Sequence, residues 1–200
     1  MEIELKSLNP KFVGLFRQTF AFTEEEFALF LSFFQFKTIC KKEYYLRAGE
    51  LCKAKAYLNK GCARNFVVDE KGHERILFFP FEDWWLGDFD SYYSGKPATN
   101  YVQMLEDSEL LVISKEHFQK AEQEIPKLKQ WYSSKMLSSA SAARNRIEEM
   151  KTLSAEELYL KLLEKQPHIF QRIPLQYIAS YLNIEPQSLS RMRKRLLKNH

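Results

Sequence analysis

The polar residues with the most informative spacing lie near the carboxyl terminus. They lie between residues 187 and 195, and on a helix they would share one face. On the other face, Leu189, Met192 and Leu196 recur at steps of three and four. Amide, hydroxyl and basic side chains hydrogen-bond to base edges and to phosphates. The pattern therefore predicts a helix that offers a polar, cationic face to nucleic acid. The residues of that face are Gln187, Ser188, Ser190, Arg191, Lys194 and Arg195.

A second short helix is predicted just before this one. Its apolar stripe is made by Tyr177, Ile178, Tyr181 and Leu182. Asn183 follows, a residue that tolerates the left-handed conformation at a helix end, and Pro186 suits the first turn of the next helix. Two short amphipathic helices joined by a tight turn form a helix-turn-helix, with small Ala179 where the helices cross. The alternative is an ordinary helical hairpin with a solvated basic face.

The positive charge of the chain is concentrated in the same segment. Residues 171–200 hold six basic side chains and one carboxylate, a net charge of +5, whereas the whole chain carries +4. The rest of the chain is thus close to −1, so the part expected to meet a polyanion carries the excess. The basic residues are Arg172, Arg191, Arg193, Lys194, Arg195 and Lys198, against Glu185.

Composition and length bound the remaining possibilities. The 200 residues are 45% hydrophobic, enough for a packed core, and no apolar run approaches the roughly 20 residues of a membrane span. The first residues lack the basic cap and apolar centre of a secretory signal. Cys40, Cys52 and Cys62 are an odd number without a CxxC pair, which favours reduced thiols in a cytoplasmic protein with no membrane partner.

Three further regions precede the basic segment. Residues 1–35 are predicted to be helical, with a new helix start at Thr23 and Glu26 in the pattern of a capping box. From Phe36 to Ile113, short β-rich segments separated by turns favour an antiparallel sandwich, barrel or jelly roll. The turn at 69–72, which ends in Gly72, predicts a hairpin. The β-rich segments span residues 37–46, 54–61, 63–70, 74–81 and 101–114.

A long helix is predicted to begin at Pro126, after a shorter helix that Ser114 caps. Its apolar residues recur at threes, fours and one seven-residue gap, and small residues lie beside them, which favours a helix that pairs with a second copy. The alternative is that this stripe packs on the chain's own β domain. The expected dimer residues are Leu128, Tyr132, Met136, Ala143, Ile147 and Met150. A further helix is predicted to begin after Ser154 and to end before Pro167.

This order of parts, with the segment IASYLNIEPQSLSRMRKRL, resembles the catabolite-activator/fumarate-nitrate-regulator (Crp/Fnr) family of transcription factors. The resemblance implies an α+β fold: an antiparallel, cyclic-nucleotide-binding-like β-roll with flanking helices in residues 1–122, a dimerisation helix in 123–152 and a winged-type helix-turn-helix in 153–200. It also implies a cytoplasmic homodimer that regulates transcription at near-palindromic double-stranded DNA, with half-sites about 34 Å apart. RNA polymerase would be a further partner.

Position by position, the resemblance assigns roles on the last helix. Gln187, Ser188 and Arg191 correspond to base-reading side chains, and Arg191 suits guanine. Pro186 stands where several members have a base-contacting polar residue, so their target sequence does not transfer. The expected phosphate contacts are Ser190, Arg193, Lys194, Arg195 and Lys198.

The sequence departs from the family in its phosphate cassette. Gly87 is kept, Asp88 replaces glutamate, and Ala98 stands where the arginine belongs, followed by Thr99. Loss of that arginine removes a charge-assisted bond worth about 1.5–3 kcal/mol, and Lys96 lacks the planar fork that could replace it, so cyclic AMP is not expected in the usual mode. The nearby aromatic residues would hold a more apolar effector or fill the pocket themselves. They are Trp84, Trp85, Phe89, Tyr92 and Tyr93.

No motif supports catalysis, a metal or a cofactor. The histidines form no HExxH, no GxSxG elbow occurs, and the Gly95-Lys96 pair lacks the rest of a phosphate loop. Three scattered cysteines do not supply the four thiolates of an iron–sulfur cluster, and His73 is expected on the surface. The alternative function is a module that binds a small molecule, either a cyclic nucleotide or an apolar effector, and uses its helix-turn-helix for protein contacts.

Overall fold

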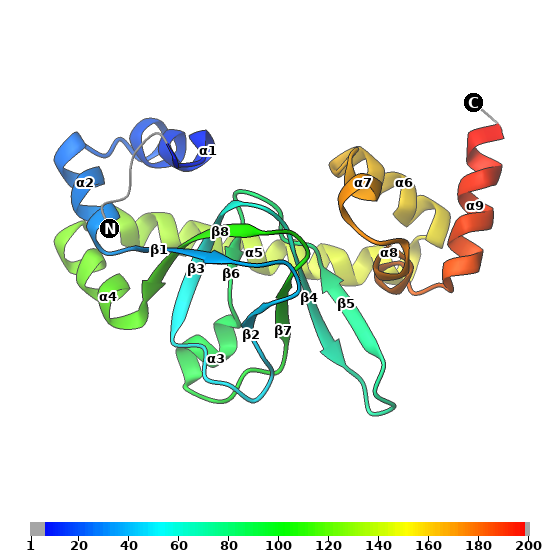
Figure 1. Ribbon diagram of the computed structural model, residues 1–200. Helices are drawn as coiled ribbons and strands as arrows, with labels where there is room; N and C mark the ends of the chain where they lie inside the picture. Colours follow the sequence, from blue (N-terminus) through cyan, green and yellow to red (C-terminus); the bar gives the residue numbers. More distant parts are fainter. Residues whose placement is uncertain (1–6, 199–200) are drawn as a thin grey trace.

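The computed structural model describes residues 7–198 and places two β-sheets between two groups of helices (Figure 1). One group, at the amino-terminal end, comprises α1 (Pro10–Gly14), the π-helical turn η2 (Leu15–Thr19) and α2 (Glu24–Ser32). The expected capping box opens α2, because the Thr23 hydroxyl accepts from the Glu26 amide and the Glu26 carboxylate accepts from the Thr23 amide. The predicted helical stretch is therefore confirmed in its described part, and residues 1–6 lie outside it.

The two sheets are antiparallel and together form the β-roll. Sheet A has the order β1-β8-β3-β6 and sheet B the order β2-β7-β4-β5. Their strands are β1 (Gln35–Ile39), β2 (Tyr44–Leu46), β3 (Ala54–Lys60), β4 (Ala63–Val68), β5 (Glu74–Phe78), β6 (Trp85–Leu86), β7 (Tyr101–Met104) and β8 (Ser108–Ser114). The predicted hairpin joins β4 to β5, and Gly72 has a φ of +82°. The two-residue β6 was not expected, because it is too short to show periodicity.

Three apolar clusters hold these layers together. One fills the space between the sheets and includes Leu58, Val102 and Leu110. A second joins the outer face of sheet A to the amino-terminal helices and to the start of α5. The third joins the outer face of sheet B to the carboxyl-terminal helices. Each sheet therefore buries both of its faces, and the helices at either end are extensions of the same core.

Two helices connect the β-roll to the carboxyl-terminal part. They are α4 (Lys115–Glu124), with Ser114 as its cap, and α5 (Lys127–Thr152), which follows Pro126 as expected. In Figure 1, α5 runs past the sheets from the amino-terminal helices to the last four helices. Leu128 is fully buried and Tyr132 partly buried in the chain's own core. The expectation of partner contacts is wrong for Leu128, because its side chain is already covered.

The later part of α5 has a different environment. Met136 is 37% exposed, Ile147 56% and Met150 52%, and Ala143 is exposed as well. These residues follow one another at steps of seven, four and three, so they form one apolar stripe on the outside of this chain. The periodicity predicted one apolar face along the whole helix, but it did not distinguish the half that the chain itself covers. Pairing of the exposed half with a second copy stays a prediction.

The last four helices are α6 (Ala155–Lys165), α7 (Ile169–Arg172), α8 (Leu175–Tyr181) and α9 (Pro186–Lys198). The hydroxyl of Ser154 and the carboxylate of Glu157 form the capping box that begins α6. Residues 153–198 contain no strand, so the described part of the chain lacks the wing that the resemblance implied. The boundary expected at residue 152 coincides with the end of α5, whereas the one at 122 falls inside α4; the division into domains remains a prediction.

Within the described residues, no helix is long and apolar enough to cross a membrane, and no group of metal-binding side chains occurs.

Candidate nucleic-acid interface and adjoining cavity

Helices α8 and α9 form the helix-turn-helix that the sequence predicted. Asn183 takes the left-handed conformation, with φ at +55°, and the Ile184 amide donates to the Ala179 carbonyl at 3.0 Å. Ala179 and Leu189 are fully buried at the contact between the two helices. The turn and its apolar seam fix the angle at which α9 leaves the body of the protein.

The base-reading residues that the sequence proposed lie on the outer face of α9. Gln187 and Arg191 are exposed and Ser188 is partly exposed, with the Arg191 guanidinium 3.5 Å from the Ser188 hydroxyl. In Figure 1, α9 stands at the opposite end of the molecule from α1 and α2, with its outer side uncovered. These side chains are therefore free to meet an external partner.

The proposed phosphate contacts are in more varied environments. Lys194 is exposed, and Ser190 is partly exposed. Arg195 forms an ion pair with Glu156 of α6, and the Arg193 guanidinium lies 4.0 Å from the centre of the Phe170 ring. The side chain of Lys198 lies outside the described part. Arg193 and Arg195 thus also hold α9 against α6 and α7.

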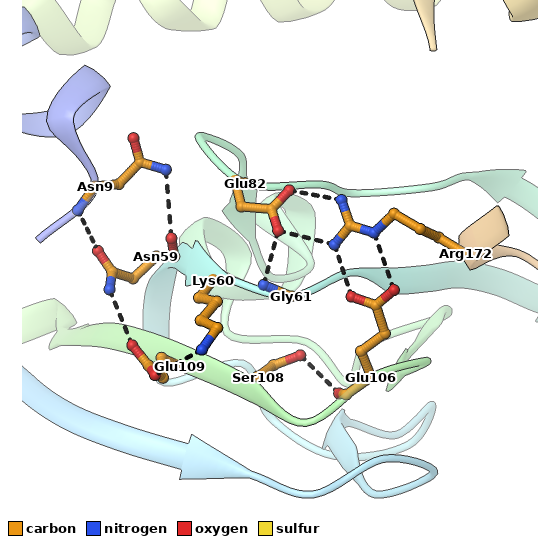
Figure 2. Close-up of polar contacts among 9 residues, drawn as sticks. All are labelled: Asn9, Asn59, Lys60, Gly61, Glu82, Glu106, Ser108, Glu109 and Arg172. Atoms are coloured by element: carbon orange, nitrogen blue, oxygen red, sulfur yellow. Dashed lines mark hydrogen bonds and ion pairs between the residues drawn. The ribbon is translucent and has the colours of Figure 1, made fainter. Parts of the chain in front are cut away.

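Arg172 attaches α7 to the β-roll, as Figure 2 shows. Its guanidinium donates to Glu106 at 2.9 and 2.7 Å and to Glu82 at 2.9 and 2.8 Å, and Glu82 also accepts from the Gly61 amide at 3.0 Å. Hydrogen bonds to Glu106 and then to Glu82 raise the pKa of Arg172 further above its ordinary range. The sequence assigned Arg172 only to the basic segment, because its partners lie 66 and 90 residues away.

Two more contacts fix the helix-turn-helix to the rest of the chain. The Ser180 hydroxyl of α8 donates to the Glu74 carbonyl at 3.1 Å and accepts from the Ile76 amide at 3.2 Å, so it pairs with the free edge of sheet B. The Arg146 guanidinium of α5 donates to the Tyr181 carbonyl at 2.8 Å, at the end of α8. The position of α9 therefore depends on both the β-roll and the long helix.

A buried lysine lies where the β-roll, α3 (Phe89–Ser94), α4 and α5 meet. Lys55 is 1% exposed, and its Nζ lies 3.5 Å from the ring centre of Tyr132 and 3.6 Å from that of Phe118. The rings of Tyr92 and Tyr93 complete the enclosure, and the Tyr93 hydroxyl accepts a hydrogen bond from Nζ at 3.2 Å. Aromatic faces attract the cation, whereas loss of water disfavours it.

Replacing Lys55 with methionine should change how stability depends on pH. Burial lowers the pKa of Lys55 to about 7, although Glu122 and Cys52 favour its charge. The unfolded chain keeps this proton up to about pH 10, whereas the folded chain loses it near pH 7. Between these two pH values the free energy of unfolding is therefore expected to rise with pH, by up to about 1.4 kcal/mol per pH unit. Lys55→Met should therefore be more stable near neutral pH, and its advantage should shrink as the pH rises.

Urea unfolding of both proteins at several pH values measures this difference. Burial raises the pKa of Cys62 and Cys52, and these thiols make the free energy of unfolding fall with rising pH in both proteins. The difference between the two proteins therefore reports on Lys55 alone. Parallel stability curves for the two proteins would contradict the prediction.

A cavity of about 380 Å³ opens between sheet B, the β6–α3 turn and α5. Leu77, Phe78, Pro80 and Phe89 give it apolar walls, and Ala143 of the long helix lies at its edge. None of the described residues around it is a lysine, arginine or histidine. The remaining lining residues are Asn65, Val67, Trp85, Leu86, Gly87, Asp88, Asp90, Thr99, Asn100 and Val102.

The altered phosphate cassette borders this cavity, and its carboxylate is hydrogen-bonded to nearby backbone amides. Asp88 caps α3 by accepting from the Ser91 amide at 2.9 Å, and its second oxygen accepts from the Thr99 amide at 3.0 Å. Ala98 is buried, and Lys96 is exposed and absent from the cavity wall. Gly87 has a φ of +146°, and a Cβ there would lie 3.3 Å from the Cys52 sulfur. The structure thus brings the four cassette residues together without a cation.

The aromatic residues expected around the pocket divide between several places. Phe89 and Trp85 line the cavity, but Trp85 also packs against Tyr57 in the core. Trp84 stacks on Phe78 and is 42% exposed. Tyr92 and Tyr93 turn toward Lys55 instead. The sequence did not indicate the inward-facing amides of Asn65 and Asn100, because isolated asparagines carry no periodic signal.

Comparison with known proteins identifies the β-roll. Residues 36–124 match the cyclic nucleotide-binding domain family. CLP of Xanthomonas campestris, described as a c-di-GMP-responsive global regulator, aligns with 88% of this chain and 93% of its own at a TM-score of 0.71 and 15% identity. FixK2 of Bradyrhizobium japonicum aligns at a TM-score of 0.69 and 13% identity, covering 83% of this chain and 85% of its own. The Thermus thermophilus catabolite activator protein aligns at 0.58 and 22%, covering 92% and 87%. No curated protein matches the sequence significantly.

Proposed function

We propose that this chain, which has a cyclic nucleotide-binding domain at residues 36–124 and the fold of the Crp/Fnr regulators, is a cytoplasmic transcription regulator that binds double-stranded DNA. The observation that carries the proposal is the outer face of α9. Gln187 and Arg191 are exposed there, while Leu189 and Met192 on the opposite face are buried. A helix held in this way can enter the major groove and present those side chains to base edges.

The proposed regulator acts as a homodimer. The exposed stripe of Met136, Ala143, Ile147 and Met150 supports pairing of α5 with a second copy, because apolar side chains at near-heptad spacing bury one another in a coiled coil. Two copies of α9 would then address a near-palindromic site. Since Arg146 of α5 hydrogen-bonds to the end of α8, the geometry of the two paired α5 helices would set the separation of the two copies of α9.

The β-roll is proposed to act as the regulatory part, without using cyclic AMP in the usual mode. The cassette supports this, because Asp88 accepts hydrogen bonds from the Ser91 and Thr99 amides and none of the described residues in the cavity wall offers a cation to a phosphate. Catalysis has no place in the proposal.

Replacing Arg191 with alanine tests the proposal. We expect a loss of about 1–3 kcal/mol of DNA-binding free energy, concentrated at one base pair of the site, because a bidentate contact to guanine discriminates between bases. Sites are first selected from random DNA, and affinities are then measured on duplexes that each carry one changed base pair. Arg75→Ala, an exposed arginine on the β4–β5 hairpin, is the matched control and should leave affinity unchanged. A loss that is uniform over all duplexes would make Arg191 a phosphate contact instead.

A further inference from the structure

We propose that the cavity of the β-roll binds a small aromatic molecule that carries an amide or amino-heteroaromatic edge and no negative charge. This inference rests on the proposed function, because it names the class of effector for the same regulator. Four features of the described residues support it: two buried amides, the charge of the wall, the apolar surfaces, and the contact with α5.

Asn65 lies on the inner face of sheet B, and Asn100 lies just before the first residue of β7. Along β4, the neighbour Arg64 lies against the Tyr177 ring of α8, 4.2 Å from its centre, so Asn65 points to the opposite side. Asn100 precedes β7 and is two residues from Val102, which is buried between the sheets. Both asparagines line the cavity.

Among the described residues, neither side-chain oxygen has a hydrogen-bond donor. Asn65 is 1% and Asn100 9% exposed, and the side-chain oxygen of each is buried with no hydrogen-bond partner. Buried amide oxygens are almost always paired, because an unpaired one loses the bonds that it makes in water. Two such groups in the wall of one cavity indicate that a ligand supplies N–H donors there.

The charge of the wall excludes anions. Asp88 and Asp90 line the cavity, and no described basic side chain does. A carboxylate or phosphate would enter next to two negative charges without a compensating cation. A neutral molecule avoids this repulsion, and its amide can pair with an asparagine side chain through one donor and one acceptor.

The rest of the wall accommodates a flat apolar body. Phe78, Phe89, Leu77 and Pro80 supply apolar surface, and about 380 Å³ lies within the range of small-molecule sites. Ala143 gives a bound molecule direct contact with α5. Occupancy would therefore be sensed by the helix that also bonds to the helix-turn-helix through Arg146.

The experiment compares neutral amides with the carboxylates of the same shape. The probes are benzamide and benzoate, nicotinamide and nicotinate, indole-3-acetamide and indole-3-acetate, with cyclic AMP as a further anion. Binding to the full chain is measured without DNA, by calorimetry and by ligand-observed NMR. We expect at least one amide to bind at least about tenfold more tightly than its carboxylate partner and than cyclic AMP. Because DNA is absent, a failure here and a failure to bind DNA are separate results.

Variants then assign the binding to the two amides. Asn65→Leu and Asn100→Leu are expected to weaken amide binding at least about tenfold, whereas Asn145→Leu, an exposed asparagine outside the cavity wall, should leave it unchanged. Without ligand, Asn65→Leu should raise the melting temperature, because it removes an unpaired buried oxygen; this also verifies that the variant is folded. The proposal is overturned if no amide binds, if the carboxylates bind as well, or if the folded leucine variants retain full affinity.

Discussion

Raising the salt concentration from about 50 mM to about 200 mM should weaken DNA binding about 10³–10⁵-fold. Each phosphate contact releases condensed counterions, and six to ten contacts give a loss of this size. In the proposed dimer, two copies of α9 would bring two sets of basic residues to the duplex: Arg193, Lys194, Arg195 and Lys198. Arg195 would exchange Glu156 for a phosphate at little cost, since an exposed ion pair is worth about 0–1 kcal/mol. Fluorescence anisotropy on a labelled duplex measures the slope.

A single substitution sharpens this test. Lys194→Ala should reduce the magnitude of the salt slope by about two per dimer, because each copy loses about one phosphate contact. Lys129→Ala removes an exposed lysine of α5, far along the chain from α9, and should leave the slope unchanged. Affinity that does not depend on salt would favour the alternative, in which the helix-turn-helix contacts another protein.

The docking of the helix-turn-helix gives the proposed regulator a physical route from the β-roll to DNA. Arg172 bonds to two loop carboxylates, Ser180 to the edge of β5, and Arg146 of α5 to the end of α8. A shift of either the β-roll or α5 would strain at least one of these contacts. The orientation of α9 is therefore expected to respond to events at both.

Local signals in the sequence predicted the elements but not how they meet. Asn183, Pro186 and the helix starts at Thr23 and Ser154 are recognised from a few neighbouring residues, because the hydrogen bonds that they make are local, and all lie where expected. The apolar stripe of α5 was ambiguous for the opposite reason. Periodicity defines which face is apolar, whereas the partner that covers Leu128 is set by tertiary packing.

The buried charged and polar groups could not be predicted from the sequence. Lys55 lies in a strand that reads as alternating, yet it is buried among rings contributed by α3, α4 and α5. The pairing of Arg172 with Glu82 depends on strand register and loop position, and so do the unpaired side-chain oxygens of Asn65 and Asn100. A single sequence contains no local signal for such long-range contacts.

Leu189→Ala should lower the free energy of unfolding by about 2–5 kcal/mol and abolish DNA binding. Leu189 is fully buried between α8 and α9, so truncation leaves a cavity that the tight turn cannot close. Without this contact α9 no longer holds its angle to α8. Urea unfolding followed by far-ultraviolet circular dichroism measures the stability, and anisotropy measures the binding. Arg191→Ala is the matched control, because it should lose affinity while changing stability by less than about 0.5 kcal/mol.

Tryptophan fluorescence and circular dichroism can also show whether Leu189→Ala destabilises the last helices alone or the whole chain. The tryptophans of the chain, Trp84, Trp85 and Trp131, all precede residue 153, so their fluorescence reports on the β-roll and the start of α5. Leu189 shares an apolar cluster with Phe66 of sheet B, and we therefore expect fluorescence and circular dichroism to shift together. A shift confined to circular dichroism would show that the last helices unfold independently. In that case the contacts of Arg172 and Ser180 would be too weak to couple the β-roll to α9.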